Sequence, residues 1–165
     1  IGEQLTDARA RIATELAVEF AALGPVISSD LAAVQVVFRP GWDRSVTLSE
    51  ALERSAASDA AQGFTQIGPH RADLRLIVEG VAASDLLSRG QMKLLVVALK
   101  LVQGRLVERA AARSPLYLVD DLPAELDKNH CASVCSQLAS GRQVDVISSM
   151  TLSEMIWSIS VISWS

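Results

Sequence analysis

The sequence predicts an α/β fold, in which helices pack on a sheet. Half of the 165 residues are hydrophobic but only 4% are aromatic, a balance that suits helices on a sheet better than an all-β sandwich. Short β-branched runs such as residues 34–38 alternate with longer segments of helical periodicity. At this length the chain can bury the core of one domain, or of one domain with a small appendage.

Composition also limits the classes of function. The formal net charge is -4, so the chain has no overall basic field of the kind that drives nonspecific nucleic-acid binding, and any DNA contact must be local or shared. No run approaches the roughly 20 apolar residues that span a bilayer. The first twenty residues mix acidic and basic side chains and contain no apolar signal region. We therefore expect a cytoplasmic protein.

The amino-terminal segment carries an apolar stripe with spacings of three and four residues, which predicts a helix over 4–23 that faces something apolar. Gly24-Pro25 should end this helix. A start inside such a helix, with no initiator Met, suggests a fragment of a larger protein. The stripe consists of Leu5, Ala8, Ile12, Leu16, Phe20 and Leu23.

Two short elements are expected next. The β-branched run at 34–38 reads as a strand. Thr47 is followed three residues later by Glu50, which is a capping-box pattern and predicts a short helix over 47–61.

The middle of the chain predicts two strands and a long helix. Residues 64–68 and 72–81 alternate apolar and polar side chains, as strands with one buried face do. Ser88 then precedes a long run of apolar residues with helical periodicity, which predicts a long helix despite Gly104.

A βαβ unit follows. Residues 116–119 are a short apolar run that ends in Asp120-Asp121, as in a buried parallel strand with functional residues at its carboxyl end. A helix over 128–138 and a strand over 144–147 complete the unit. The two cysteines lie on one face of that helix, and we interpret them as reduced, partly buried thiols rather than a zinc site.

Two motifs contain residue types that handle phosphate. LYLVDD at 116–121 matches a Walker B strand, in which the first acid holds Mg²⁺ and the second positions or activates water. LSRGQ at 87–91 supplies a hydroxyl, a glycine that lets the backbone approach an anion, and the positive end of a helix dipole. Each motif has an ordinary alternative: two acids that begin a solvated loop, and a serine cap with glycine in the first turn.

The order of these motifs favours phosphate chemistry, because it follows the signature, Walker B and D-loop plan of ATP-binding-cassette (ABC) ATPases. TQIGPHRADL at 65–74, LSRGQMKLL at 87–95 and LYLVDDLPAELD at 116–127 resemble the bacterial RecF family. SMC-type ATPases usually have Glu after the signature glycine and at the second Walker B position, where this chain has Gln91 and Asp121. The resemblance covers roughly residues 35–144.

The resemblance implies an architecture and a set of site residues. Residues 1–61 would be part of a helical arm (lever) subdomain, and 62–165 the carboxy-terminal part of an ABC-type P-loop NTPase head. Asp120 would bind Mg²⁺, Asp121 would orient or activate the hydrolytic water, and Asp127 in the D loop would lie at a dimer interface. The signature residues would contact the γ-phosphate of ATP held by the other subunit of a homodimer: Leu87, Ser88, Arg89, Gly90 and Gln91.

By the same resemblance, the protein would be an ATP-dependent dimerising clamp on DNA at single-strand gaps. It would assist RecA loading together with RecO and RecR, in repair, recombination, replication and the SOS response. The sequence contains no GxxxxGK[ST] phosphate loop, so we expect this chain alone neither to bind ATP tightly nor to hydrolyse it. Two alternatives stay open: a non-enzymatic interaction fragment, or an SMC-type cassette ATPase head.

The sequence departs from the family pattern at several places. The D loop reads AELD where SELD is usual, and Asp145 replaces an apolar residue of a strand. From Ser148 onward the resemblance fades, and the tail at 151–165 alternates like an exposed strand. The histidine of GPHR at 68–71 is better interpreted as a hydrogen-bonded structural residue than as a base.

Overall fold

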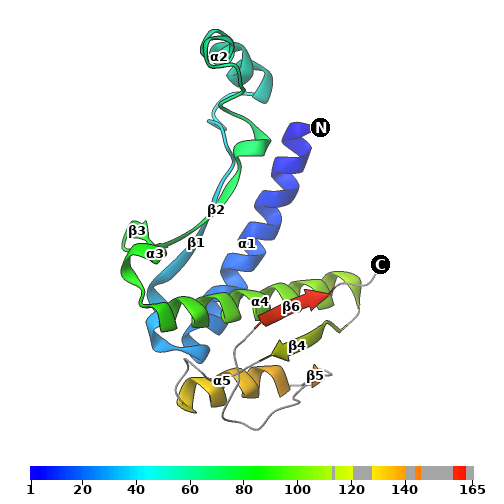
Figure 1. The fold of residues 1–165 in the computed structure, drawn as a ribbon. Helices are drawn as coiled ribbons and strands as arrows, with labels where there is room; N and C mark the ends of the chain where they lie inside the picture. Colours follow the sequence, from blue (N-terminus) through cyan, green and yellow to red (C-terminus); the bar gives the residue numbers. More distant parts are fainter. Residues whose placement is uncertain (113, 121–127, 140–143, 146–157, 163–165) are drawn as a thin grey trace.

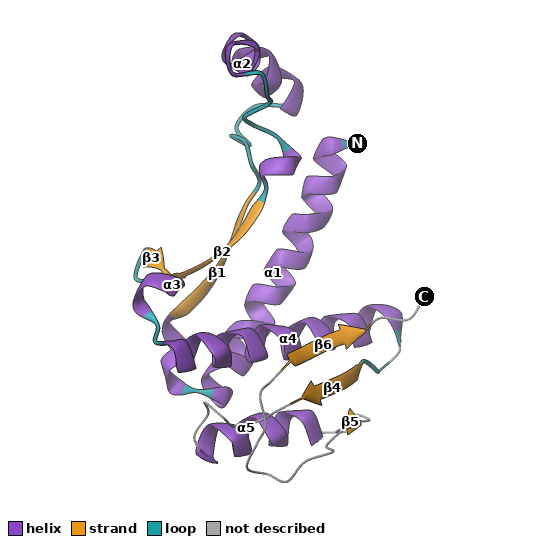
Figure 2. Ribbon diagram, in the orientation of Figure 1, coloured by secondary structure: helices purple, strands orange, loops and turns teal. Residues whose placement is uncertain are grey.

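The structure is a computed structural model in which an arm extends from a helical core (Figure 1). It describes residues 1–112, 114–120, 128–139, 144–145 and 158–162, of which 118–120, 128, 139, 144–145 and 158–162 are described by backbone alone. Helices and strands both contribute (Figure 2). The predicted α/β class is therefore confirmed.

The first helix, α1 (Gly2–Ile27), is longer than the sequence predicts. The apolar stripe is only half buried: Leu16, Phe20 and Leu23 are at most 5% exposed, whereas Leu5 and Ile12 are 43% and 59% exposed. The expected end at Gly24-Pro25 is wrong, because α1 continues for one more turn. Gly24 is buried against Phe20 and the Ser28 amide donates to its carbonyl, so packing outweighs the N–H that Pro25 lacks.

An antiparallel sheet of order β1-β2-β3 forms the arm. Val34 pairs with Val78 at one end of the β1-β2 hairpin and Arg39 with Asp73 at the other. The Glu79-Gly80 turn, where both residues have positive φ, joins β2 to β3. The elements are a 3-10 turn η1 (Ser29–Ala33), β1 (Val34–Arg39), β2 (Asp73–Val78) and β3 (Val81–Ala82).

The sequence predictions for this sheet were only partly right. The strand at 34–38 is confirmed, and 72–81 forms β2 and β3, but 64–68 is not a strand. The amino-terminal half of β2 is exposed on both faces, because nothing among the described residues covers it. Its alternating pattern is therefore present without the expected buried face.

Helix α2 (Leu48–Gln62) lies at the tip of the arm, far from the core (Figure 1). Its capping box is confirmed: the Glu50 amide donates to the Thr47 hydroxyl at 3.2 Å, and the Thr47 amide donates to the Glu50 carboxylate at 2.9 Å. Ala51 is the only α2 residue that is buried. The helix ends at Gly63, which has a φ of 77°.

The core forms where α1 crosses α4 (Arg89–Ala111), with a short helix α3 (Ala83–Leu86) before it. α4 buries a face of small and aliphatic residues, and each buried Leu or Val of this face stabilises the fold by about 2 kcal/mol when removed from water. α5 (Lys128–Ala139) packs against both long helices, as the sequence predicts for 128–138. The α4 face consists of Leu94, Leu95, Val97, Ala98, Leu101, Val102 and Gly104.

A second sheet of order β5-β4-β6 lies beside this core. β4 (Leu116–Asp120) pairs in parallel with β5 (Val144–Asp145), which confirms the predicted βαβ connection through α5. On its other edge β4 pairs antiparallel with β6 (Ser158–Ile162), so the tail that alternates with serine does form a strand. Residues 146–147 of the predicted 144–147 strand lie outside the described residues.

The predicted arm and head are joined by shared structure. β1 precedes the expected boundary at residue 61 and pairs with β2 beyond it, and α1 and α4 contribute to one hydrophobic core. The division into an arm subdomain at 1–61 and a head at 62–165 therefore stays a prediction.

Candidate functional site

The predicted signature lies at the amino-terminal end of α4, where Ser88 is the N-cap. The Gln91 amide donates to the Ser88 hydroxyl at 3.3 Å, and the Ser88 amide donates to the Gln91 side-chain oxygen at 2.8 Å. Because the helix begins at Arg89, the amides of Arg89 and Gly90 have no carbonyl partner within it. Ser88 and Arg89 are exposed, so the positive end of the helix dipole faces solvent.

A third residue fixes the signature glutamine. The Gln91 side-chain nitrogen donates to a carboxylate oxygen of Asp30 at 2.7 Å. Asp30 lies in η1, immediately after α1. Sequence reasoning missed this contact, because the two residues are 61 positions apart and no pattern in the sequence connects them.

The predicted Walker B acids are only partly covered by the structure. Asp120 is the last residue of β4, and its backbone pairs with Ser158 of β6. The predicted location at the carboxyl end of an apolar strand is thus confirmed. The Asp120 side chain, together with Asp121 and Asp127, lies outside the described residues.

The GPHR segment, residues 68–71, lies between β2 and the tip of the arm, and we call this part of the arm the neck. Gly68 has a φ of 127°, which favours glycine, and its amide donates to the carbonyl of Gly41 across the hairpin at 3.0 Å. The carbonyl of Pro69 accepts from the Arg9 guanidinium at 2.7 Å, which attaches the neck to α1. The described contacts of this segment are therefore structural.

The two basic residues of the segment also have local partners. A His70 ring nitrogen lies 3.0 Å from the Thr65 carbonyl oxygen, in agreement with the interpretation of a hydrogen-bonded structural histidine. The Arg71 guanidinium lies 5.5 Å from the centre of the Phe64 ring, within cation–π range.

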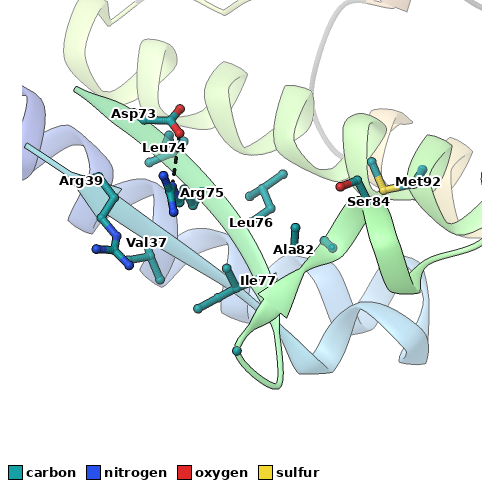
Figure 3. Close-up of a pocket in the computed structure, with 12 residues that line it drawn as sticks. Val37, Arg39, Asp73, Leu74, Arg75, Leu76, Ile77, Ala82, Ser84 and Met92 are labelled. Atoms are coloured by element: carbon teal, nitrogen blue, oxygen red, sulfur yellow. Dashed lines mark ion pairs between the residues drawn. The ribbon is translucent and has the colours of Figure 1, made fainter. Parts of the chain in front are cut away.

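A groove of about 560 Å³ runs along β2 to the start of α4 (Figure 3). Arg75 forms an ion pair with Asp73 at 3.5 Å at one end, and Ser84 and Met92 lie toward the other. Between them the lining is mainly apolar, from Val37, Leu74, Leu76 and Ile77. The exposed alternation of β2 is the sequence signal that corresponds to this groove.

Other site types receive no support from the described part of the chain. Cys131 is partly buried and Cys135 is exposed, and neither forms a disulfide. No group of three metal-ligating His, Cys, Asp or Glu side chains occurs among the residues described. Within the same ranges, none of the helices combines the length and apolar character needed to cross a membrane.

Comparison with known proteins gives close relatives in sequence. The chain is 49% identical over 114 residues to the DNA replication and repair protein RecF of Shewanella piezotolerans (strain WP3 / JCM 13877). It is 48% identical over 114 residues to the protein of that name from Shewanella pealeana (strain ATCC 700345 / ANG-SQ1). Each match covers 68% of this chain and 32% of the relative, so the matched segment is about a third of the length of these curated relatives. No family model matches the chain.

Solved structures agree on the fold. The recombination mediator protein RecF-ATP in the RecFOR pathway superposes with a TM-score of 0.73 at 20% identity, over 97% of this chain and 47% of that one. The RecF-ATPrS structure of the same pathway gives a TM-score of 0.65 at 22% identity, over 88% of this chain and 41% of that one. The chain is thus a RecF-like polypeptide that resembles the carboxy-terminal portion of that family and has the fold of part of an ABC-type ATPase head.

Proposed function

We propose that this chain supplies the signature half of a shared ATP site in a RecF-type DNA-repair ATPase. The observation that carries the proposal is the start of α4, where Ser88 caps the helix, Ser88 and Arg89 are exposed, and the Arg89 and Gly90 amides have no carbonyl partner within the helix. Backbone amides at a helix start bind phosphate oxygens well. Ser88, Arg89, Gly90 and Gln91, with Leu87 behind them, would contact the γ-phosphate of ATP held by a second subunit.

The catalytic groups would belong to the segment that follows β4. Asp120 would hold Mg²⁺, directly or through water, and Asp121 would orient or activate the water that attacks the γ-phosphate. Asp127 in the D loop would lie at the dimer interface. ATP and Mg²⁺ are the cofactors of this scheme, and both require the phosphate-loop half of the site.

The names of the relatives, which refer to DNA replication and repair and to the RecFOR pathway, support a wider role for the whole protein. An ATP-dependent homodimer would close on duplex DNA near single-strand gaps and assist RecA loading with RecO and RecR, in the cytoplasm. Because the formal net charge of the chain is -4, the DNA contact would be local or shared between subunits.

The signature role can be tested by mixing this chain with RecF of Shewanella piezotolerans. With Mg²⁺ and a slowly hydrolysed ATP analogue, the two should form a heterodimer in which the Shewanella protein holds the nucleotide and this chain supplies the signature. Sedimentation velocity measures the dissociation constant. Ser88→Ala removes a hydroxyl that faces the charged γ-phosphate, and should weaken the pairing about tenfold.

The matched control is Thr47→Ala, which removes the same kind of cap at the start of α2. It should leave the pairing unchanged. Pairing that is equally strong with ADP, or equally weakened by both substitutions, would contradict the proposal.

A further inference from the structure

We propose that Asp30 is a positioning residue for the ATP signature, acting through Gln91; this inference rests on the proposed function. The Asp30 carboxylate accepts a hydrogen bond from the Gln91 side-chain nitrogen at 2.7 Å. The Gln91 side-chain oxygen in turn accepts from the Ser88 amide at 2.8 Å. The three residues form a chain of hydrogen bonds from η1, which follows α1, to the residue that caps α4.

Asp30 is needed because a glutamine amide has two different ends. Only the oxygen end can accept the Ser88 N–H, and only the nitrogen end can donate. A carboxylate can only accept, so Asp30 selects the orientation in which the Gln91 nitrogen faces Asp30 and the oxygen faces Ser88. Without Asp30 the amide can turn over, and the Ser88 amide then loses its acceptor.

The position of Asp30 is itself well fixed. Ile27, three residues before Asp30, and Leu31, directly after it, are each 1% exposed and belong to the hydrophobic core. The carboxylate is therefore presented to Gln91 from a backbone that packing holds in place. α1 also reaches the neck of the arm through the Arg9 contact with Pro69, so one helix joins the arm to the signature.

An exchange of donor and acceptor between the two side chains tests the inference by the same pairing measurement. Asp30→Ala should weaken the ATP-dependent pairing about tenfold, since one charge-assisted hydrogen bond is lost. Asp30→Asn should pair nearly normally, because its amide oxygen can still accept from Gln91. Gln91→Glu should impair pairing, because two carboxylates would then face each other. Combining Gln91→Glu with Asp30→Asn should restore it, since the asparagine can donate to the new carboxylate.

The matched control is Glu19→Gln. Glu19 also joins α1 to α4, through Arg109 at 2.8 Å, but near the other end of α4. This variant should pair like the unmodified chain. Pairing by Asp30→Ala that equals the unmodified chain, or a double variant no better than Gln91→Glu alone, would overturn the inference.

Hydrogen exchange of the Ser88 amide, measured by NMR on the 165-residue chain without nucleotide, separates this inference from the proposed function. Asp30→Ala should accelerate that exchange about tenfold relative to Glu19→Gln. If the unmodified chain fails to pair with the Shewanella protein, the proposed function falls, and the exchange rate still decides whether Asp30 orients Gln91. An unchanged rate overturns the inference.

Discussion

The described part of the chain contains two capping boxes that are almost alike in local geometry. At the tip of the arm, Thr47 caps α2 and bonds reciprocally with Glu50. At the edge of the core, Ser88 caps α4 and bonds reciprocally with Gln91. Both match the same four-residue pattern, so the pattern identifies where a helix begins and says nothing about what that end binds.

The surroundings separate the two ends. α2 buries only Ala51, whereas α4 buries a continuous aliphatic face against α1. The Glu50 carboxylate has two equivalent oxygens and needs no further orientation, whereas the Gln91 amide is oriented by Asp30. A preorganised anion site needs a helix start that is exposed to solvent and whose position is fixed by packing and hydrogen bonds. Of these two helix starts, the α4 end alone combines these features.

The two regions should differ most in how much the free energy of unfolding changes when a glycine is replaced by alanine. Alanine is the better helix former by about 1 kcal/mol, so α4 alone would favour Gly104→Ala. In the fold, an added Cβ at residue 104 would collide with the Tyr117 ring, whose Cζ would lie at 2.6 Å. We expect a net loss of about 3 kcal/mol in the free energy of unfolding, measured by urea denaturation.

Gly63→Ala at the end of α2 is the comparison. An added Cβ there meets nothing within 4 Å, and only the φ of 77° opposes it. We expect a loss of about 1 kcal/mol, confined to the tip. If Gly104→Ala stabilised the chain, the tight contact between α4 and β4 would be wrong.

Removal of the two caps should have the next largest effect on stability. Ser88→Ala and Thr47→Ala each remove one acceptor for a helix amide, which typically costs about 1 kcal/mol. Because α4 is part of the core, the Ser88→Ala loss should appear in global unfolding. The Thr47→Ala loss should appear as faster amide exchange within α2, with little change in the urea midpoint. Equal changes in the midpoint would contradict the difference between the two regions.

The local parts of the site could be predicted from the sequence, and the tertiary parts could not. Ser88 at the start of a long helix and Asp120 at the end of an apolar strand are read from short-range patterns, and both are confirmed. The contact of Asp30 with Gln91 depends on how α1 crosses α4, which no local pattern encodes. Packing also explains one error: α1 continues through Pro25 because Leu23, Gly24 and Ile27 of its last turn are buried.

Lowering the pH should destabilise the α2 cap and leave the α4 cap unchanged. This effect should be smaller than those of the glycine and cap substitutions. The Thr47 backbone amide, followed by the Thr47 hydroxyl, holds the pKa of Glu50 below its ordinary value. A carboxyl with a lowered pKa in the folded state stabilises the fold above its unfolded pKa of about 4.3, and that contribution is lost as pH falls through the folded pKa. Gln91 does not titrate. The start of α2 should therefore fray on acidification, as seen in the Thr47 and Ala51 amide chemical shifts.

Glu50→Gln gives α2 the same side chain as the α4 cap, and should abolish this acid transition. A transition that persists in Glu50→Gln would assign it to another carboxyl at the tip, such as Asp59.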